Sequence, residues 1–333
     1  MNCRVPAGRY KQAWVKIGLA VRFAEAIDLP SEPDHTLPIR QQEEHRRTFW
    51  SVYLLDRIVS CSPERTPTIQ DGDCTLGLPI DPSGTDLLSQ TEERITLARL
   101  VDQLDDLSDV GYSGFLCLIS STLGRIQRYS LRRSVPSNSH FPWNSRSEYA
   151  SIYSALLTFE SYSPAALTSI DSVLQRESLK LGQEYSSRSQ LGILASSHAL
   201  YFLCQCLLNH PFLIRHRLST IKAPTPPSFL RDVLSRSRSN AGSLTLLLQS
   251  LLQRRLCLAS SIGYCAVVAG TIHRIFQCDD DLSVRESAQS FYKMSLNFLQ
   301  NAPVRWRHFP HMVSAPYPPR FTPFSTSTFS TSM

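Results

Sequence analysis

The stretch from Glu43 to Arg57 constrains the fold most, because it has the residue pattern of a buried helix. Its sequence is EEHRRTFWSVYLLDR. One set of side chains recurs at the three- and four-residue spacing of a single helix face: Trp50, Tyr53, Leu54, Arg57 and Cys61. We therefore predict a helix over 39–61 with this face against the core.

The charged and aromatic residues of this helix allow more than one role. Glu43 and Glu44 precede Arg47 by four and three positions, an orientation that favours ion pairs on a helix face and suits a helix N-terminus. We interpret these two carboxylates as solvated support for the helix. The aromatic side chains either pack in the core, which we favour, or line a ligand pocket: Phe49, Trp50 and Tyr53.

The whole chain favours an all-α fold. Of its 333 residues 42% are apolar, enough for one large core or two closely packed helical lobes, and 13 glycines argue against a repetitive sheet protein. No repeat of fixed period is apparent, so we predict an irregular bundle or solenoid-like packing. The periodic segments that we expect to be helical are 10–28, 39–61, 91–133, 147–160, 164–182, 188–210, 229–253, 256–277 and 284–301.

Proline- and serine-rich stretches divide the chain. We predict flexible surface linkers near 134–147 and 219–228. From residue 310 onward the chain has many Pro, Ser and Thr residues and no Asp or Glu, so we expect the 310–333 tail to be disordered. Residues 1–309 remain as one large helical domain.

Several of these segments resemble the fungal-specific transcription factor domain, or middle homology region, of the binuclear zinc cluster transcription factor family. The 43–57 motif is the specific part, and weaker similarity extends over roughly residues 10 to 310. Two places depart from the family pattern, since 64–67 (ERTP) replaces a Gly-Arg-Pro triplet and Asn209-His210 replaces a His-Arg pair. The other segments that carry the resemblance are 13–24, 66–79, 199–213, 257–276 and 291–306.

The resemblance implies a nuclear regulatory domain that controls transcription by RNA polymerase II. In the family, DNA is read by a zinc cluster that six closely spaced cysteines hold, whereas the nine cysteines of this chain are dispersed. Because Met1 lies only a few residues before the first family helix, we expect no zinc cluster in this chain and zinc as a cofactor only if a cluster exists upstream. The family-motif residues, with structural or regulatory roles, are Arg46, Arg47, Phe49, Trp50, Tyr53, Asp56, Arg57, Pro79, His210, Pro211 and Phe212.

The resemblance also sets the expected partners. We expect DNA contact only through the missing zinc cluster, and the net charge of +6 permits an anionic partner without demanding one. Transcriptional co-regulators, a small-molecule inducer and a second copy of the chain remain open as partners. A DNA-binding-deficient paralogue that acts only by protein interaction is the alternative function. We assign no catalytic or metal-binding residue, and a cofactor site is left open.

Two other classes of protein have weaker signals. Asp105, Asp106 and Asp109 have the DDxxD spacing with which helical isoprenoid synthases hold Mg²⁺, but no second metal motif accompanies them, so we expect no enzyme. The stretch 189–214 lacks Asp, Glu, Lys and Arg and is long enough to cross a bilayer. Its polar groups and Pro211 favour a buried core helix over a membrane span.

Overall fold

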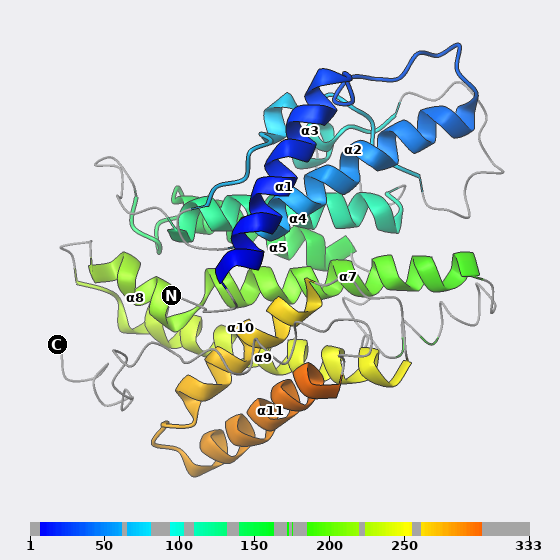
Figure 1. The fold of residues 1–333 in the computed structure, drawn as a ribbon. Coiled ribbons are helices and arrows are strands. Elements are labelled where there is room, and N and C mark those ends of the chain that lie inside the picture. Colours follow the sequence, from blue (N-terminus) through cyan, green and yellow to red (C-terminus); the bar gives the residue numbers. More distant parts are fainter. Residues whose placement is uncertain are drawn as a thin grey trace. The chain divides into compact units, whose positions relative to one another are not determined.

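The computed structural model of the protein describes residues 7–61, 65–80, 94–102, 110–131, 140–162, 172, 175, 185–219, 224–254 and 261–301. Over these residues the fold is all-α, as predicted, and an isolated bridge between Gly77 and Thr96 is the only strand-type pairing. The α-helices (Figure 1) are α1 (Ala7–Ala26), α2 (Ile39–Val59), α3 (Leu97–Asp102), α4 (Tyr112–Leu131), α5 (Glu148–Tyr162), α7 (Tyr185–Leu208), α8 (Pro211–Ser219), α9 (Pro227–Arg254), α10 (Ile262–Phe276) and α11 (Leu282–Asn301).

The helices gather into two compact units. The N-terminal unit consists of Gly8–Leu131 and Ile152–Ser197, and the C-terminal unit of Met1–Ala7, Arg132–Ser151 and His198–Met333. The division falls inside three helices, α1, α5 and α7. The assignment of residues 1–309 to one domain stays a prediction.

In the N-terminal unit, α2 packs against α4, and the short α3 contacts α4 and the 3-10 turn η1 (Asp71–Asp73). Ile119, Leu123 and Ile126 of α4 recur at helical spacing and have no exposed surface. Phe115 at the start of α4 meets Phe159 of α5 edge to face, with ring centres 5.6 Å apart. The periodicity of the α4 sequence therefore forms one apolar face, which lies in the core of this unit.

In the C-terminal unit, α9, α10 and α11 pack against one another (Figure 1). Most of α10 is buried, and its small residues Ala266, Ala269 and Gly270 lie in this core. Such a helix, apolar on nearly every side, is typical of a core position. Asp281 caps the N-terminus of α11, because its carboxylate accepts the backbone N–H of Ser283 at 2.8 Å.

Two of the predicted helix boundaries are wrong. The segment 91–133 is not one helix, because residues 94–96 precede α3 and residues 110 and 111, between α3 and α4, lie outside any helix. Helix α8 lies outside the predicted helices, the nearest of which ends at residue 210, because proline also suits the first turn of a new helix. Other predictions fall wholly or largely outside the described residues: Asp105, Asp106, Asp109, the 164–182 helix, much of the two linkers, and the 310–333 tail.

One stretch, Ser189–Ser219, is long and apolar enough to cross a membrane by its composition. In the structure it forms two helices, α7 and α8, which Asn209 and His210 separate. Within its most apolar window, 78% is buried inside the protein. This burial fits the predicted core helix.

Helix α1 ends in a Schellman motif whose left-handed residue is not glycine. The N–H of Leu29 donates to the carbonyl of Ala24 at 2.9 Å, and the N–H of Asp28 donates to the carbonyl of Glu25 at 3.1 Å. Asp28 consequently has a φ of 56°, a conformation that favours a residue without a Cβ atom. Pro30 then prevents continuation of the helix.

We expect Asp28→Gly to raise the free energy of unfolding by about 0.5–1 kcal/mol, because glycine adopts the left-handed conformation without a steric penalty. Loss of the exposed hydrogen bond from the Ser31 hydroxyl to Asp28, 2.7 Å long, reduces the gain. The β-branched Asp28→Val should instead destabilise the protein by about 1–2 kcal/mol. Denaturant unfolding followed by circular dichroism measures both changes, and equal effects of the two variants would contradict the backbone explanation.

Candidate functional site

The most elaborate polar arrangement in the N-terminal unit joins α2 to the extended chain that follows it. We refer to residues 43–57 as the α2 motif and to residues 65–80 as the clasped segment. The clasped segment contains no secondary structure except η1 and the bridge at Gly77. Because buried backbone groups require hydrogen-bond partners, most of this segment depends on side chains for them, and the α2 motif supplies many.

At the N-terminal end of the motif, Glu43 and Arg47 bind the backbone of Ile80. The Oε1 atom of Glu43 accepts the N–H of Ile80 at 2.8 Å and the Nε–H of Arg47 at 3.1 Å. Arg47 Nη2 donates to the Ile80 carbonyl at 3.0 Å. Glu43 is only 3% exposed, so its interpretation as a solvated carboxylate is wrong, since the clasped segment covers it. Glu44 does fit that interpretation, because it is exposed and pairs with Arg40.

In the middle of the motif, two side chains engage the peptide groups of Gly77. Trp50 Nε1 donates to the Gly77 carbonyl at 2.8 Å. The N–H of Gly77 donates to Oε1 of Glu32, whose Oε2 lies 2.6 Å from Nη2 of the buried Arg46. Arg46 therefore acts on the clasped segment through Glu32.

At the C-terminal end of the motif, Asp56 and Arg57 are both buried, with 2% and 0% of their surface exposed. Asp56 Oδ2 accepts the N–H groups of Thr68 at 2.8 Å and Ile69 at 3.1 Å, and Nη1–H of Arg57 at 3.0 Å. Arg57 Nη2 donates to the Ile69 carbonyl at 2.9 Å and to Asp71 at 2.6 Å. The guanidinium is thus paired and hydrogen-bonded, as a buried charge requires.

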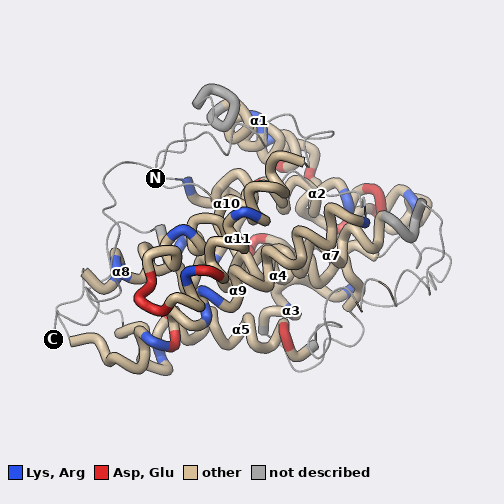
Figure 2. The backbone as a smooth tube through the Cα atoms, turned by 90° about the horizontal axis from the view of Figure 1, so that it is seen from below, with Lys and Arg blue, Asp and Glu red and all other residues tan. Residues whose placement is uncertain are grey.

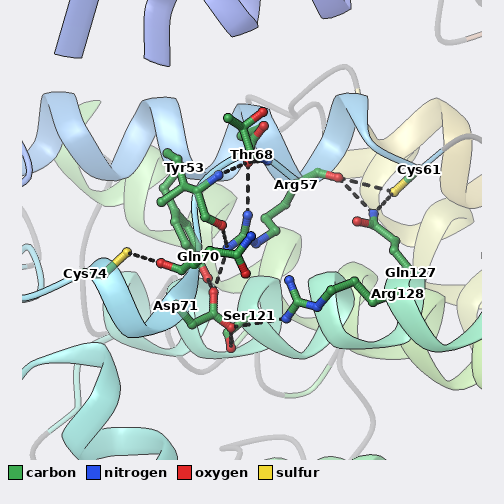
Figure 3. Close-up of polar contacts among 12 residues, drawn as sticks. Tyr53, Arg57, Cys61, Thr68, Gln70, Asp71, Cys74, Ser121, Gln127 and Arg128 are labelled. Carbon is green, nitrogen blue, oxygen red and sulfur yellow. Dashed lines mark hydrogen bonds and ion pairs between the residues drawn. The ribbon is translucent and has the colours of Figure 1, made fainter. Parts of the chain in front are cut away.

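Asp71 joins α2 to α4 (Figure 3). Its Oδ1 accepts the Tyr53 hydroxyl at 2.8 Å, and its Oδ2 accepts the Ser121 hydroxyl at 2.8 Å. The guanidinium of Arg128 lies 3.9 Å from Oδ2. The Arg57 guanidinium carbon also lies 4.1 Å from the centre of the Tyr53 ring, a cation–π distance.

Helix α4 approaches Arg57 closely because residue 124 is glycine. A Cβ atom on Gly124 would lie 2.8 Å from Nε of Arg57. One turn along α4, Gln127 donates to the Arg57 carbonyl at 2.9 Å and contacts Sγ of Cys61 at 2.7 Å (Figure 3). The contact between α2 and α4 is therefore polar and specific as well as apolar.

Asp71 and Glu32, which pair with buried arginines, stay ionised. Burial alone would raise the pKa of Asp71, but the charge of Arg57 and the hydrogen bonds to Asp71 outweigh burial and lower this pKa below its ordinary value of 3.8. Burial would likewise raise the pKa of Glu32, and its bonds with Arg46 and a backbone N–H lower it. Burial raises the pKa of Tyr53, so its hydroxyl remains a hydrogen-bond donor.

Most cysteines of the described residues are buried thiols, and Cys278 is exposed. Burial raises the pKa of Cys61 and of Cys74 to about 12 and also raises the pKa of Cys117 and Cys206, which disfavours the thiolate that metal ligation requires. Within the part of the chain that the structure describes, no group of three or more His, Cys, Asp or Glu residues could hold a metal ion.

The motif at His210 begins a helix in the C-terminal unit. Pro211 is the first residue of α8, and His210 Nδ1 accepts the N–H of Phe212 at 3.3 Å, in the manner of an N-cap. His210 Nε2 lies 3.1 Å from the hydroxyl oxygen of Thr271, which donates its own proton to the Val268 carbonyl at 2.6 Å. A neutral imidazole that donates from Nε2 satisfies both contacts. Burial lowers the pKa of His210 to about 4.

The structure thus places the motif residues in two separate groups. Pro79 lies half-buried near the end of the clasped segment, beside the α2 group, and Phe49 packs edge to face on Trp50 with ring centres 5.3 Å apart. Sequence reasoning missed the partners of the motif, although two arginines on an apolar face indicate that buried carboxylates must exist. The first group is Arg46, Arg47, Phe49, Trp50, Tyr53, Asp56, Arg57 and Pro79, and the second is His210, Pro211 and Phe212. The missed residues are Glu32, Asp71, Gly77, Ser121, Gly124 and Gln127.

We expect Gly77→Ala to lower the free energy of unfolding by about 1–3 kcal/mol, because its Cβ would lie 2.5 Å from Cβ of Arg94 and 3.0 Å from Oε1 of Glu32. Gly72→Ala is the matched control in the same segment, since a Cβ there meets no atom within 4 Å. That control should be neutral or slightly stabilising. Urea unfolding compares the two variants, and an equal loss in both would show that close packing at Gly77 is not the cause.

These contacts define an all-α module in which the charged and aromatic motif residues hold the fold together. Residues 3–159 match the family model of the fungal specific transcription factor domain. This part of the chain is therefore the middle homology region of the fungal zinc cluster transcription factors, as the motif predicted.

Three characterised relatives are similar to the chain. The Zn(2)-C6 fungal-type transcription factors FTF1c and FTF2 of Fusarium oxysporum f. sp. lycopersici are 23% and 22% identical over 91% of this chain, which aligns with 33% and 29% of their lengths. The thiamine repressible genes regulatory protein thi1 of Schizosaccharomyces pombe is 28% identical over 29% of this chain and 13% of its own length. The chain thus spans about a third of the length of its first relatives. No solved structure matches it significantly.

Proposed function

We propose that this chain is the regulatory part of a fungal transcription factor that controls RNA polymerase II transcription in the nucleus, and that a zinc cluster outside these 333 residues binds the DNA. The observation that carries the proposal is the clasp, in which the buried polar side chains of the α2 motif are bound to the clasped segment, Glu32 or α4. A motif engaged in this way serves the fold rather than catalysis or base recognition. The family match and the relatives named as Zn(2)-C6 factors support the same function.

The distribution of charge also supports a regulatory role without direct DNA contact. Along the described backbone, Lys and Arg positions occur in short stretches interspersed with Asp and Glu (Figure 2). A nucleic-acid-binding face usually has basic residues clustered on one side. In this proposal a metabolite or co-regulator binds one conformation of the domain better than another and so shifts its population.

A tethering experiment tests the regulatory function. We expect residues 1–333, fused to an unrelated DNA-binding domain, to change transcription of a reporter gene at least several-fold relative to that DNA-binding domain alone. The unfused chain should not retard DNA in a gel at physiological salt. A folded, nuclear fusion protein that leaves the reporter unchanged would contradict the proposal.

The location of the DNA-binding module requires a separate measurement. Sequencing of the 5′ end of the native transcript would reveal an upstream in-frame exon for a six-cysteine cluster, or would establish a start at Met1. The first result supports a sequence-specific factor, and the second supports a paralogue that acts only by protein interaction. Thermal stabilisation by Mg²⁺ together with an isoprenoid diphosphate would instead support an enzyme that uses Asp105, Asp106 and Asp109.

A further inference from the structure

One face of helix α4 meets α2 and the clasped segment. Its members recur at alternating three- and four-residue intervals, which align side chains on one side of a helix: Gly114, Cys117, Ser121, Gly124 and Arg128. All of them except Cys117 have a neighbour on α2 or in the clasped segment. Cys117 lies between them on the same face and is only 1% exposed, so its thiol also faces the clasped segment.

The clasped segment runs antiparallel to this face of α4. Two contacts fix the register: the hydroxyl of Ser121 donates to Asp71 at 2.8 Å, and Cδ1 of Leu78 lies 3.6 Å from the position of a Cβ atom on Gly114. Between these contacts the segment passes over Cys117. Residues 72, 73 and 75 are exposed, whereas Cys74 is only 2% exposed. Cys74 is therefore the residue of this stretch that turns toward Cys117.

Two further observations place the sulfur atoms near each other. A thiolate at Cys74 would raise the pKa of Cys117 beyond the effect of burial, which requires a direct electrostatic interaction between the two groups. In Figure 3, Cys74 and Gln127 lie on opposite sides of Asp71 along α4. Because Gln127 follows Ser121 in α4 and Cys117 precedes it, Cys74 lies toward the Cys117 end of the helix.

Cys61 is too far from Cys117 to compete with Cys74. Its sulfur contacts Gln127 at 2.7 Å, and Gln127 is about 15 Å beyond Cys117 along the helix axis. A disulfide requires Cα atoms within about 7 Å of each other. Cys74 and Cys117 are therefore the two thiols that the clasp brings together.

We propose that Cys74 and Cys117 form a redox-sensitive dithiol, and that hydrogen peroxide oxidises it to a disulfide between the clasped segment and α4. The Cys74 sulfur first attacks a peroxide oxygen, the O–O bond breaks, and one water leaves with the thiol proton, so that Cys74 becomes a sulfenic acid. The Cys117 sulfur then attacks the Cys74 sulfur, which forms the S–S bond, breaks the S–O bond and releases a second water. The two thiols lose two electrons in total, and these electrons reduce the peroxide to water.

The clasp determines when this reaction can begin. Burial raises the pKa of both thiols, and the thiolate is the form that reacts, so the closed clasp protects the pair. Cys74 lies between the exposed Asp73 and Thr75 on an irregular segment, whereas Cys117 lies inside a helix. Opening of the clasp therefore exposes Cys74 first, and closure returns its sulfenic acid to Cys117. The resulting disulfide prevents further opening.

Peptide mapping of the peroxide-treated full chain tests the pairing. Trypsin leaves Cys61, Cys74 and Cys117 on separate peptides, which are 58–65, 66–94 and 100–125. After alkylation of the free thiols in denaturant, we expect mass spectrometry to detect peptide 66–94 linked to peptide 100–125, and a reductant to separate them. Full alkylation of both peptides after peroxide treatment would overturn the proposal. So would a link from peptide 66–94 mainly to any other cysteine peptide.

Alanine variants test the order of attack. With a 1,3-diketone reagent that traps sulfenic acids, Cys117→Ala protein should be labelled at Cys74 on peroxide treatment, whereas Cys74→Ala protein should stay nearly unlabelled at Cys117. Cys61→Ala is the matched control and should form the same disulfide as wild type. A low concentration of urea, which opens the clasp more often, should speed the labelling of Cys74. Stronger labelling at Cys117 than at Cys74 would contradict the proposed order.

Urea unfolding with and without reductant measures the effect of the disulfide on the clasp. Because a cross-link restricts the unfolded chain, oxidised wild-type protein should unfold at a higher urea concentration than reduced protein. Cys74→Ala protein, with the circular dichroism spectrum of wild type, should have the same unfolding midpoint before and after peroxide treatment. A disulfide that forms without raising the midpoint would overturn its role as a lock on the clasp.

Discussion

Replacement of Arg57 by methionine should lower the free energy of unfolding by about 3–5 kcal/mol. The Arg57 side chain has no exposed surface, and it is the counter-ion of Asp56 at 3.0 Å and of Asp71 at 2.6 Å. Methionine fills part of the volume but leaves Asp56 buried without its cation and the Ile69 carbonyl without one of its donors. Urea unfolding followed by circular dichroism at pH 7 measures the loss. Arg57→Lys should recover little of it, because a single ammonium cannot reach all three acceptors in the fork geometry of a guanidinium.

The matched control for this prediction is Arg40→Met on the same helix. The Arg40 side chain is 89% exposed, and its ion pair with Glu44 spans 3.2 Å. Exposed ion pairs contribute little to stability, so the free energy of unfolding of this variant should stay within about 0.5 kcal/mol of the wild-type value. In a double-mutant cycle, Arg57→Met and Asp71→Asn should couple by at least about 1 kcal/mol. Strictly additive losses would show that the two residues act independently.

The second large effect should appear as acid sensitivity of the C-terminal unit. Burial lowers the pKa of both His210 and His273 from an ordinary value of 6.5 to about 4. Between these pH values the unfolded chain binds protons that the folded chain does not, so the free energy of unfolding falls as the pH falls from 6.5 toward 4. Once both states are fully protonated, the pKa shift of each histidine has lowered the free energy of unfolding by about 3 kcal/mol.

Both histidines have hydrogen-bond partners, and protonation would break one contact of His210. His210 accepts the N–H of Phe212, and a second proton would remove this acceptor. His273 Nε2 lies 2.9 Å from the hydroxyl of Thr245, and its ring stacks on Phe291 with centres 5.2 Å apart. Burial therefore holds both imidazoles in the neutral form, and for His210 the contact with Phe212 favours the same form.

Denaturant unfolding at several pH values from 4.5 to 7.5 measures this dependence. His210→Asn keeps a capping side chain that does not titrate, so it should flatten the pH dependence, and His273→Gln should flatten it further. The carboxylates Asp71 and Glu32 have lowered pKa values, and their contribution is lost only as the pH falls below their ordinary values of 3.8 and 4.5. An unchanged slope between pH 5 and 6.5 in the double variant would contradict the prediction.

Local patterns predicted the helices and the buried face of α2, because the signal of a helix face lies within a few turns of sequence. They did not predict the partner of Arg57, since Asp71 follows a stretch without periodicity and Ser121 lies 50 residues beyond Asp71. The burial of Glu43 was missed for the same reason. Its spacing from Arg47 indicated the ion pair, but no nearby residue indicated that Ile80 would cover it.

The clasp makes the backbone hydrogen bonds of the clasped segment as long-lived as those of the neighbouring helix α2. The N–H groups of Thr68, Ile69, Gly77 and Ile80 donate to the carboxylates of Asp56, Glu32 and Glu43. Their hydrogens can exchange with solvent only when these hydrogen bonds break. Their amide hydrogens should therefore exchange about as slowly as those within α2, and α2 and the clasped segment should open together as one cooperative unit.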